Sequence, residues 1–97
     1  MPNNQSLIIA IAWAIFFTSE LTASYAAEPA FCKQYANAAV NQVRAGNKIP
    51  ACAGSIQGAR WSPEHGVHYA WCLGATHSAA GIERIARTQI LKACAGR

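Results

Sequence analysis

Apolar residues recur at helical spacing in this chain. In residues 31–45 they occupy positions 31, 35, 39 and 43, and no Gly or Pro interrupts the segment. The tripeptide Ser62-Pro63-Glu64 is a typical helix start and predicts a second helix that ends near Leu73. Ser78 can cap a third helix over residues 79–95. One face of that third helix carries Ile82, Ile85, Ala86, Gln89 and Ala93.

A different apolar pattern occupies the start of the chain. Residues 7–17 are eleven consecutive apolar residues, too few for a membrane span of about 20 residues but typical of a secretory signal peptide. Small residues at Ser24 and Ala26 suit signal peptidase, so we expect residues 1–26 to be a signal peptide and 27–97 the mature domain. Residues 1–6 contain no Lys or Arg, which leaves an uncleaved anchor segment as the alternative.

The mature part is short and poor in large apolar residues. Among its 71 residues, only 11 are Phe, Ile, Leu or Val, about 15%. Sustained alternation of apolar and polar residues is absent from the sequence, so we expect an all-α fold of three helices. A core this small needs covalent support.

Four cysteines supply that support. Cys32, Cys52, Cys72 and Cys94 all lie in the mature part, and an even number in a short exported chain is typical of disulfides. No two of them have the C-x2-C spacing of a zinc site or a redox pair. We expect the loop after the first helix to return the chain to the start of that helix. The second helix would then run alongside the first and bring Cys72 near Cys52, and the third would run back and bring Cys94 near Cys32. The predicted disulfides are therefore Cys32–Cys94 and Cys52–Cys72. The alternative, Cys32–Cys72 with Cys52–Cys94, requires the second helix to run the opposite way.

Three short motifs follow one another in the mature part. C-x2-YA-x2-AV-x-Q begins at Cys32, RW at Arg60, and H-x2-WC at His68, and a charged helix then ends on Cys94. This pattern resembles a group of short exported proteobacterial proteins and domains that have no established biochemical activity. The resemblance implies a compartment and a fold, and no catalytic residue.

Histidines are the candidates for metal binding. His65 and His68 are three residues apart on the predicted second helix and share a face with Cys72. With Cys72 in a disulfide, a zinc or copper site would have to use His65, His68 and His77. The simpler interpretation is that His68 packs beside Trp71 and makes one hydrogen bond to the backbone, with no metal and no other cofactor bound.

Arg60 and Trp61 are the candidates for recognition. An arginine stacked on a tryptophan offers a cationic and aromatic surface, so Arg60, Trp61, His65 and His68 form the tentative binding surface. The alternative is that Trp61 covers one end of the core. We expect Trp71, next to a half-cystine, to be a core residue.

The spread of charge and the absence of catalytic motifs argue against several classes of function. The mature part carries a net charge of +5, spread along the chain and including Arg84 and Arg87 on the third helix, which does not favour sequence-specific nucleic-acid binding. The sequence has no nucleophile elbow, no His-Glu-x-x-His and no phosphate loop, so we expect no enzyme and no catalytic residues. We expect a periplasmic or secreted binding or structural protein of the bacterial cell envelope, whose partner is a protein or an anionic envelope component. The alternatives are a metal-binding protein and a small inhibitor or toxin-like effector.

Overall fold

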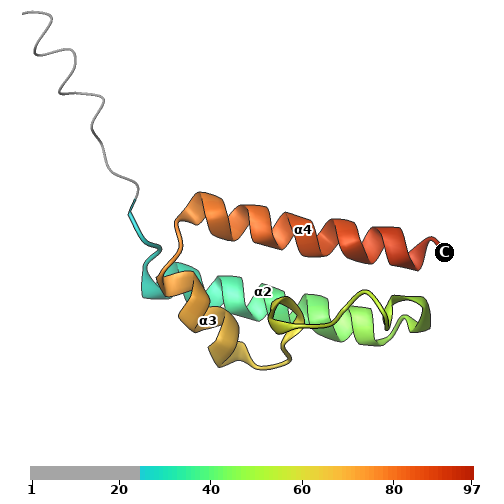
Figure 1. Ribbon diagram of the computed structural model, residues 1–97. Coiled ribbons are helices and arrows are strands. Elements are labelled where there is room, and N and C mark those ends of the chain that lie inside the picture. The colour runs from blue at the N-terminus through green and yellow to red at the C-terminus, as the bar shows by residue number, and fades with distance from the viewer. Residues whose placement is uncertain (1–24) are drawn as a thin grey trace, which may run out of the picture.

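The computed structural model describes residues 25–97, so nearly all of the expected signal peptide lies outside the described residues. Three α-helices make up most of the described chain: α2 (Pro29–Asn47), α3 (His65–Leu73) and α4 (His77–Ala95). Two 3-10 helices, η1 (Pro50–Cys52) and η2 (Ala59–Trp61), lie in the connection between α2 and α3 (Figure 1). The expected all-α, three-helix, disulfide-linked domain is confirmed for residues 25–97.

Helix α2 is the element on which the rest of the domain packs. Pro29 occupies its first turn, where the missing N–H costs nothing, and an Ala-rich sequence continues the helix. One stripe is buried, at the spacing expected of a core-facing helix: Cys32, Tyr35, Ala36, Ala39, Val40, Val43 and Gly46. These residues include positions 35, 39 and 43 of the apolar pattern, while Phe31 is only partly buried.

The last turn of α2 has no room for a side chain. A Cβ placed on Gly46 would lie 2.9 Å from Leu91 Cδ2 of α4 and 3.3 Å from Ile56 of the following loop. The backbone N–H of Ile49 donates to the Gly46 carbonyl oxygen, which keeps η1 and Cys52 at this end of α2. A side chain at position 46 would therefore have to displace the ends of the Leu91 and Ile56 side chains, so this close approach favours glycine.

The second and third helices begin near, but not at, the expected residues. Helix α3 begins at His65 because the Ser62 hydroxyl accepts a hydrogen bond from the Glu64 N–H in a turn before the helix. Helix α4 begins at His77, and its cap is Thr76, whose hydroxyl oxygen accepts from the Ala79 N–H at 3.0 Å. Ser78, the expected cap, lies inside the first turn.

The predicted disulfide pairing is wrong, and the alternative pairing is present. Cys32 is bonded to Cys72 and Cys52 to Cys94, which leaves no free cysteine in the protein. Helix α2 is about 28 Å long at 1.5 Å per residue, and the loop covers only part of the way back along it. Helix α3 continues this return and brings Cys72 to the start of α2. Helix α4 then runs parallel to α2 and brings Cys94 to Cys52 (Figure 1).

The Cys52–Cys94 disulfide also sets which face of α4 is turned inward. Ala80, Arg87 and Cys94 are buried, and they lie on one face because seven residues make nearly two helical turns. Ile82 and Ile85, on the apolar face identified from the sequence, are instead 65% and 56% exposed. The covalent anchor thus outweighs the apolar stripe in orienting this helix.

The core is small and contains much sulfur. All four half-cystines are fully buried, and Cys32 and Cys72 cluster with Ala27, Tyr35 and Ala80 where the three helices begin or end. Phe31 and Tyr69 cover this cluster from outside. Within residues 25–97, no helix combines the length and the apolar character that crossing a bilayer requires.

Candidate functional site

The structure separates the four residues of the expected binding surface. Arg60 and His65 are exposed, whereas Trp61 and His68 are buried, with exposed fractions of 5% and 3%. Trp61 is buried on η2, a short element that contacts α2, so it covers the core and cannot stack with Arg60 on the surface. Of the expected surface of Arg60, Trp61, His65 and His68, only Arg60 and His65 are exposed.

Trp71 departs from the role expected from the sequence, whereas Trp61 takes the core position that was its alternative. Trp71, the expected core residue, is 45% exposed, although it directly precedes the half-cystine Cys72 in α3. Its ring lies 5.5 Å from the Tyr35 ring, between centroids, at an interplanar angle of 32°. Trp71 therefore packs its ring against the core and leaves nearly half of its surface to solvent.

His68 makes the backbone hydrogen bond expected of it. Its Nε2 atom lies 2.8 Å from the carbonyl oxygen of Ser62, and because a carbonyl can only accept, Nε2 carries the proton and donates. This bond closes the turn before α3 onto the helix. His68 thus stabilises the loop and has one ring nitrogen already in use.

The three histidines do not converge. His77 stacks on Phe31 with the ring centroids 4.0 Å apart, and its Nε2 bonds Glu28, while His65 lies near Tyr69. Within residues 25–97, the structure contains no group of three or more His, Cys, Asp or Glu residues that could hold a metal ion. The alternative site of His65, His68 and His77 is therefore not assembled.

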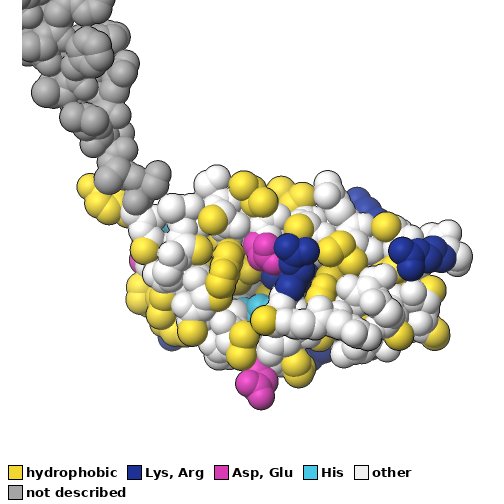
Figure 2. Space-filling view, in the orientation of Figure 1, with side chains coloured by type: hydrophobic (Ala, Val, Ile, Leu, Met, Phe, Trp, Pro, Cys, Tyr) yellow, Lys and Arg dark blue, Asp and Glu magenta, His cyan; other side chains and the backbone are white. Residues whose placement is uncertain are grey.

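A groove of about 240 Å³ lies between α3 and α4 and is the best candidate site. We call it the α3–α4 groove, and it is lined by Tyr35, Ala59, Arg60, Val67, His68, Trp71, Glu83 and Arg87. Val67 and Trp71 of α3 form an exposed apolar wall, and Glu83 and Arg87 of α4 form a charged one. Figure 2 shows acidic and basic side chains meeting among apolar ones on this face.

Arg87 is the unusual residue of the groove, because its side chain is completely buried. Its Nε donates to the Gln42 side-chain oxygen at 2.7 Å, and its guanidinium carbon lies 5.2 Å from the centroid of the Tyr35 ring. Glu83 is the nearest carboxylate, but its Oε1 is 3.8 Å from Nη1, too far for a hydrogen bond. Neither Nη1 nor Nη2 has a hydrogen-bond partner among the described residues.

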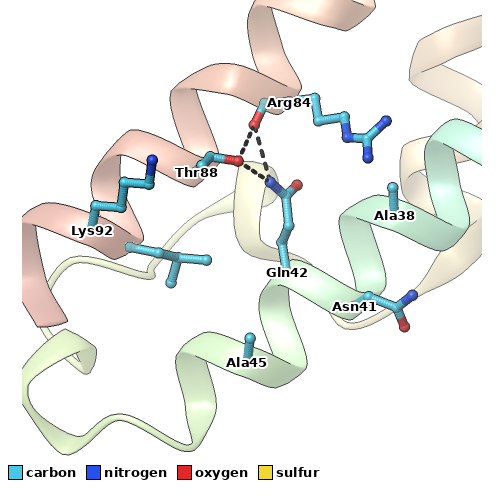
Figure 3. A pocket seen from close by; sticks show the side chains of 8 residues that line it. Ala38, Asn41, Gln42, Ala45, Arg84, Thr88 and Lys92 are labelled. Atoms are coloured by element: carbon cyan, nitrogen blue, oxygen red, sulfur yellow. Dashed lines mark hydrogen bonds between the residues drawn. The ribbon is translucent and has the colours of Figure 1, made fainter.

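Gln42 of α2 holds Arg87 in place. Its amide nitrogen donates to the Arg84 carbonyl oxygen at 3.0 Å and to the Thr88 hydroxyl at 2.9 Å (Figure 3). Its oxygen accepts from Arg87 Nε. A wider hollow of about 450 Å³ opens on this side of α4, where Ala38, Asn41 and Lys92 also line it. Its central amide is already hydrogen-bonded, so this hollow offers less for recognition than the α3–α4 groove.

An ion pair closes one side of the α3–α4 groove. Arg60 of η2 donates from Nε to Glu83 Oε1 at 2.5 Å and from Nη2 to Oε2 at 3.3 Å. Both side chains remain partly exposed to solvent. Glu83 thus lies between two guanidinium groups but hydrogen-bonds only that of Arg60.

The sequence analysis gave neither Arg87 nor Gln42 a role in a site, although Gln42 is the last residue of the motif that begins at Cys32. Arg84 and Arg87 belong to the charge spread along the chain, yet Arg84 is exposed and Arg87 is buried. A further signal for Arg87 is the seven-residue spacing of Ala80, Arg87 and Cys94, which becomes informative once Cys94 is known to face inward.

A hydrogen-bonded pair away from the groove, Glu28 and His77, makes a pH-dependent contribution to stability. The hydrogen bond from His77 lowers the pKa of Glu28 below its ordinary value of 4.5, so the carboxylate stabilises the fold above that value and stops doing so as the pH falls. We expect Glu28→Gln to lower the free energy of unfolding more at pH 7 than at pH 3, by urea unfolding at both pH values. Glu64→Gln, at another exposed glutamate, is the matched control. An equal effect of Glu28→Gln at both pH values would contradict the prediction.

Comparisons with protein families, with curated proteins and with solved structures find no match for this chain. The motif-based resemblance to exported proteobacterial proteins therefore stays a prediction.

Proposed function

We propose that this chain is a small exported binding protein without enzymatic activity, which contacts its partner through the α3–α4 groove. Two disulfides with no free cysteine indicate a non-reducing, extracytoplasmic environment. Export through a signal peptide that is cleaved after Ala26 accounts for that environment. Ala27 supports this boundary, since it is buried and its N–H donates to the Ala75 carbonyl oxygen, while Tyr25 is 80% exposed.

One observation carries the proposal: an exposed apolar wall stands beside a buried arginine whose two terminal nitrogens have no hydrogen-bond partner within residues 25–97. Exposed Val67 and Trp71 favour contact with an apolar group, and the guanidinium favours an anionic one. Among the expected partners, this combination favours an anionic component of the cell envelope over a protein. The single carboxylate of the groove is held by Arg60, which supports binding over general acid–base chemistry.

The test is binding of the protein, recovered from the periplasm of an expressing bacterium, to defined anionic probes. We expect cosedimentation with lipopolysaccharide micelles or phosphatidylglycerol vesicles, and none with phosphatidylcholine vesicles. Trp71→Ala should weaken this binding about tenfold or more, since it removes the aromatic wall of the groove. Ile82→Ala, at an exposed apolar residue of α4 outside the groove lining, is the matched control.

Two outcomes would contradict the proposal. Equal loss from Trp71→Ala and Ile82→Ala would show that contact is not made through the groove. Binding that is as strong to phosphatidylcholine as to the anionic probes would show that charge does not contribute. The intact mass should show a chain that begins at Ala27 and lacks four hydrogens, and a retained residue 1–26 segment would refute the cleaved signal peptide.

A further inference from the structure

We infer that the α3–α4 groove binds a small monocarboxylate with an apolar or aromatic body, whose carboxylate is received by the Arg87 guanidinium. This inference rests on the proposed function, because it names the chemical class of ligand for the same groove.

The state of Arg87 is the first argument. A guanidinium carries five N–H donors, and burying such a charge without partners is costly. Only Nε is hydrogen-bonded among the described residues, to Gln42, while Nη1 and Nη2 are buried and unpartnered. A carboxylate that accepts from both terminal nitrogens in a planar, bidentate fork satisfies these donors.

The charge of the groove indicates a monoanion. Its lining includes two guanidinium groups, Arg60 and Arg87, and one carboxylate, Glu83. One positive charge therefore stays uncompensated when Glu83 is paired with Arg60. A single carboxylate neutralises this charge, whereas a phosphate dianion would add a negative charge close to Glu83.

The walls and the size of the groove describe the rest of the ligand. Tyr35, Val67 and Trp71 supply apolar and aromatic surface next to the charged groups. The volume, about 240 Å³, is below the range typical of sites for drug-sized ligands. A short branched or aromatic acid fits this description. Its body packs against Trp71, and its carboxylate reaches the guanidinium of Arg87, which is buried in the free protein, by taking the place of Glu83.

Glu83 opposes this ligand, which provides a sharp test. The Glu83 carboxylate is within 4 Å of both arginines, so it occupies the position from which an incoming carboxylate would also approach them. The Arg60–Glu83 pair is partly exposed, and such pairs contribute little to stability, so it can yield to the ligand. Removing the charge of Glu83 should therefore strengthen binding of a carboxylate.

The experiment titrates benzoate into the oxidised protein as recovered from the periplasm, by calorimetry and by chemical shifts of the Arg87 and Trp71 side-chain N–H groups. We expect saturable one-to-one binding of benzoate that is about tenfold or more tighter than that of benzamide, its uncharged counterpart. We also expect phenyl phosphate to bind more weakly than benzoate. The absence of saturable benzoate binding, or tighter binding of phenyl phosphate, overturns the inference.

Two variants connect the binding to these side chains. Glu83→Gln should tighten benzoate binding about fivefold, because it removes a negative charge about 4 Å from the guanidinium. Arg87→Lys should weaken it about tenfold, since an ammonium cannot form the bidentate fork. Arg84→Gln, at an exposed arginine of the same helix, should leave binding nearly unchanged. If Arg87→Lys does not fold, the Glu83→Gln result decides, and unchanged affinity there overturns the inference.

The two proposals fail separately. Benzoate binding can be absent while Trp71→Ala still abolishes binding to anionic micelles or vesicles, in which case the groove is the contact surface but not a carboxylate site. Loss of both sets of results refutes the proposed function as well.

Discussion

Replacing Cys52 and Cys94 together by Ala should lower the free energy of unfolding by about 4 kcal/mol, from the loss of chain entropy in a loop of this size. The two cysteines are 42 residues apart, so their disulfide strongly restricts the unfolded chain. A domain of about 70 residues has a total stability of roughly 4 to 10 kcal/mol. We therefore expect this variant to be largely unfolded at 37 °C, even though only two small side chains change.

Urea unfolding monitored by circular dichroism measures the effect, with the Cys32→Ala/Cys72→Ala variant as the partner measurement. Cys32 and Cys72 are 40 residues apart, so the expected loss of unfolding free energy for this variant is nearly the same. A tryptic map of the unreduced protein checks the pairing itself, because cleavage after Lys33, Arg60, Arg84 and Lys92 separates all four cysteines. A link between peptides 49–60 and 61–84 would contradict the structure, and a loss below about 1 kcal/mol would contradict the entropic argument.

Trp61→Ala should have the second large effect, a loss of about 3 to 5 kcal/mol of unfolding free energy. Trp61 is only 5% exposed, and it packs a large ring into a core that has few other large side chains. Truncating it removes the buried ring of η2 and leaves a cavity in the core, and both losses lower the stability.

Trp71→Ala is the matched control, since it is the same substitution at a tryptophan that is 45% exposed. We expect it to cost about 1 kcal/mol or less. The thermal midpoints of the two variants, measured at equal concentration, give the comparison. Equal midpoints, or a lower one for Trp71→Ala, would contradict the assignment of Trp61 to the core and Trp71 to the groove.

Interactions between residues that are close in the sequence determined much of this fold. The buried stripe of α2 follows directly from the spacing of its apolar residues, because a helix places residues three and four apart on one face. The all-α class followed from the absence of alternating patterns, and the number of disulfides followed from an even set of cysteines in a chain with a small core. The helix starts were placed within about two residues, since capping depends only on neighbouring residues.

The path of the loop between α2 and α3 was not determined in this way. Its direction decides whether α3 runs toward or away from the start of α2, and both choices satisfy the local sequence. The tertiary structure decides through Gly46, where η1, Ile56 and Leu91 meet the last turn of α2 and keep Cys52 at that end. The disulfide pairing then follows from the positions of the helix ends.

The candidate site depends on the same long-range choice. The seven-residue spacing of Ala80, Arg87 and Cys94 does not by itself indicate which side of α4 faces the core. Arg87 is buried because it shares a face with Cys94, which is bonded to Cys52. Ile82 of the same helix faces outward for the same reason. Sequence alone thus determined which helices form and that disulfides support them, because these depend on near neighbours. Only the tertiary structure decided which faces meet, because two covalent bonds between distant residues set the orientation of α3 and α4.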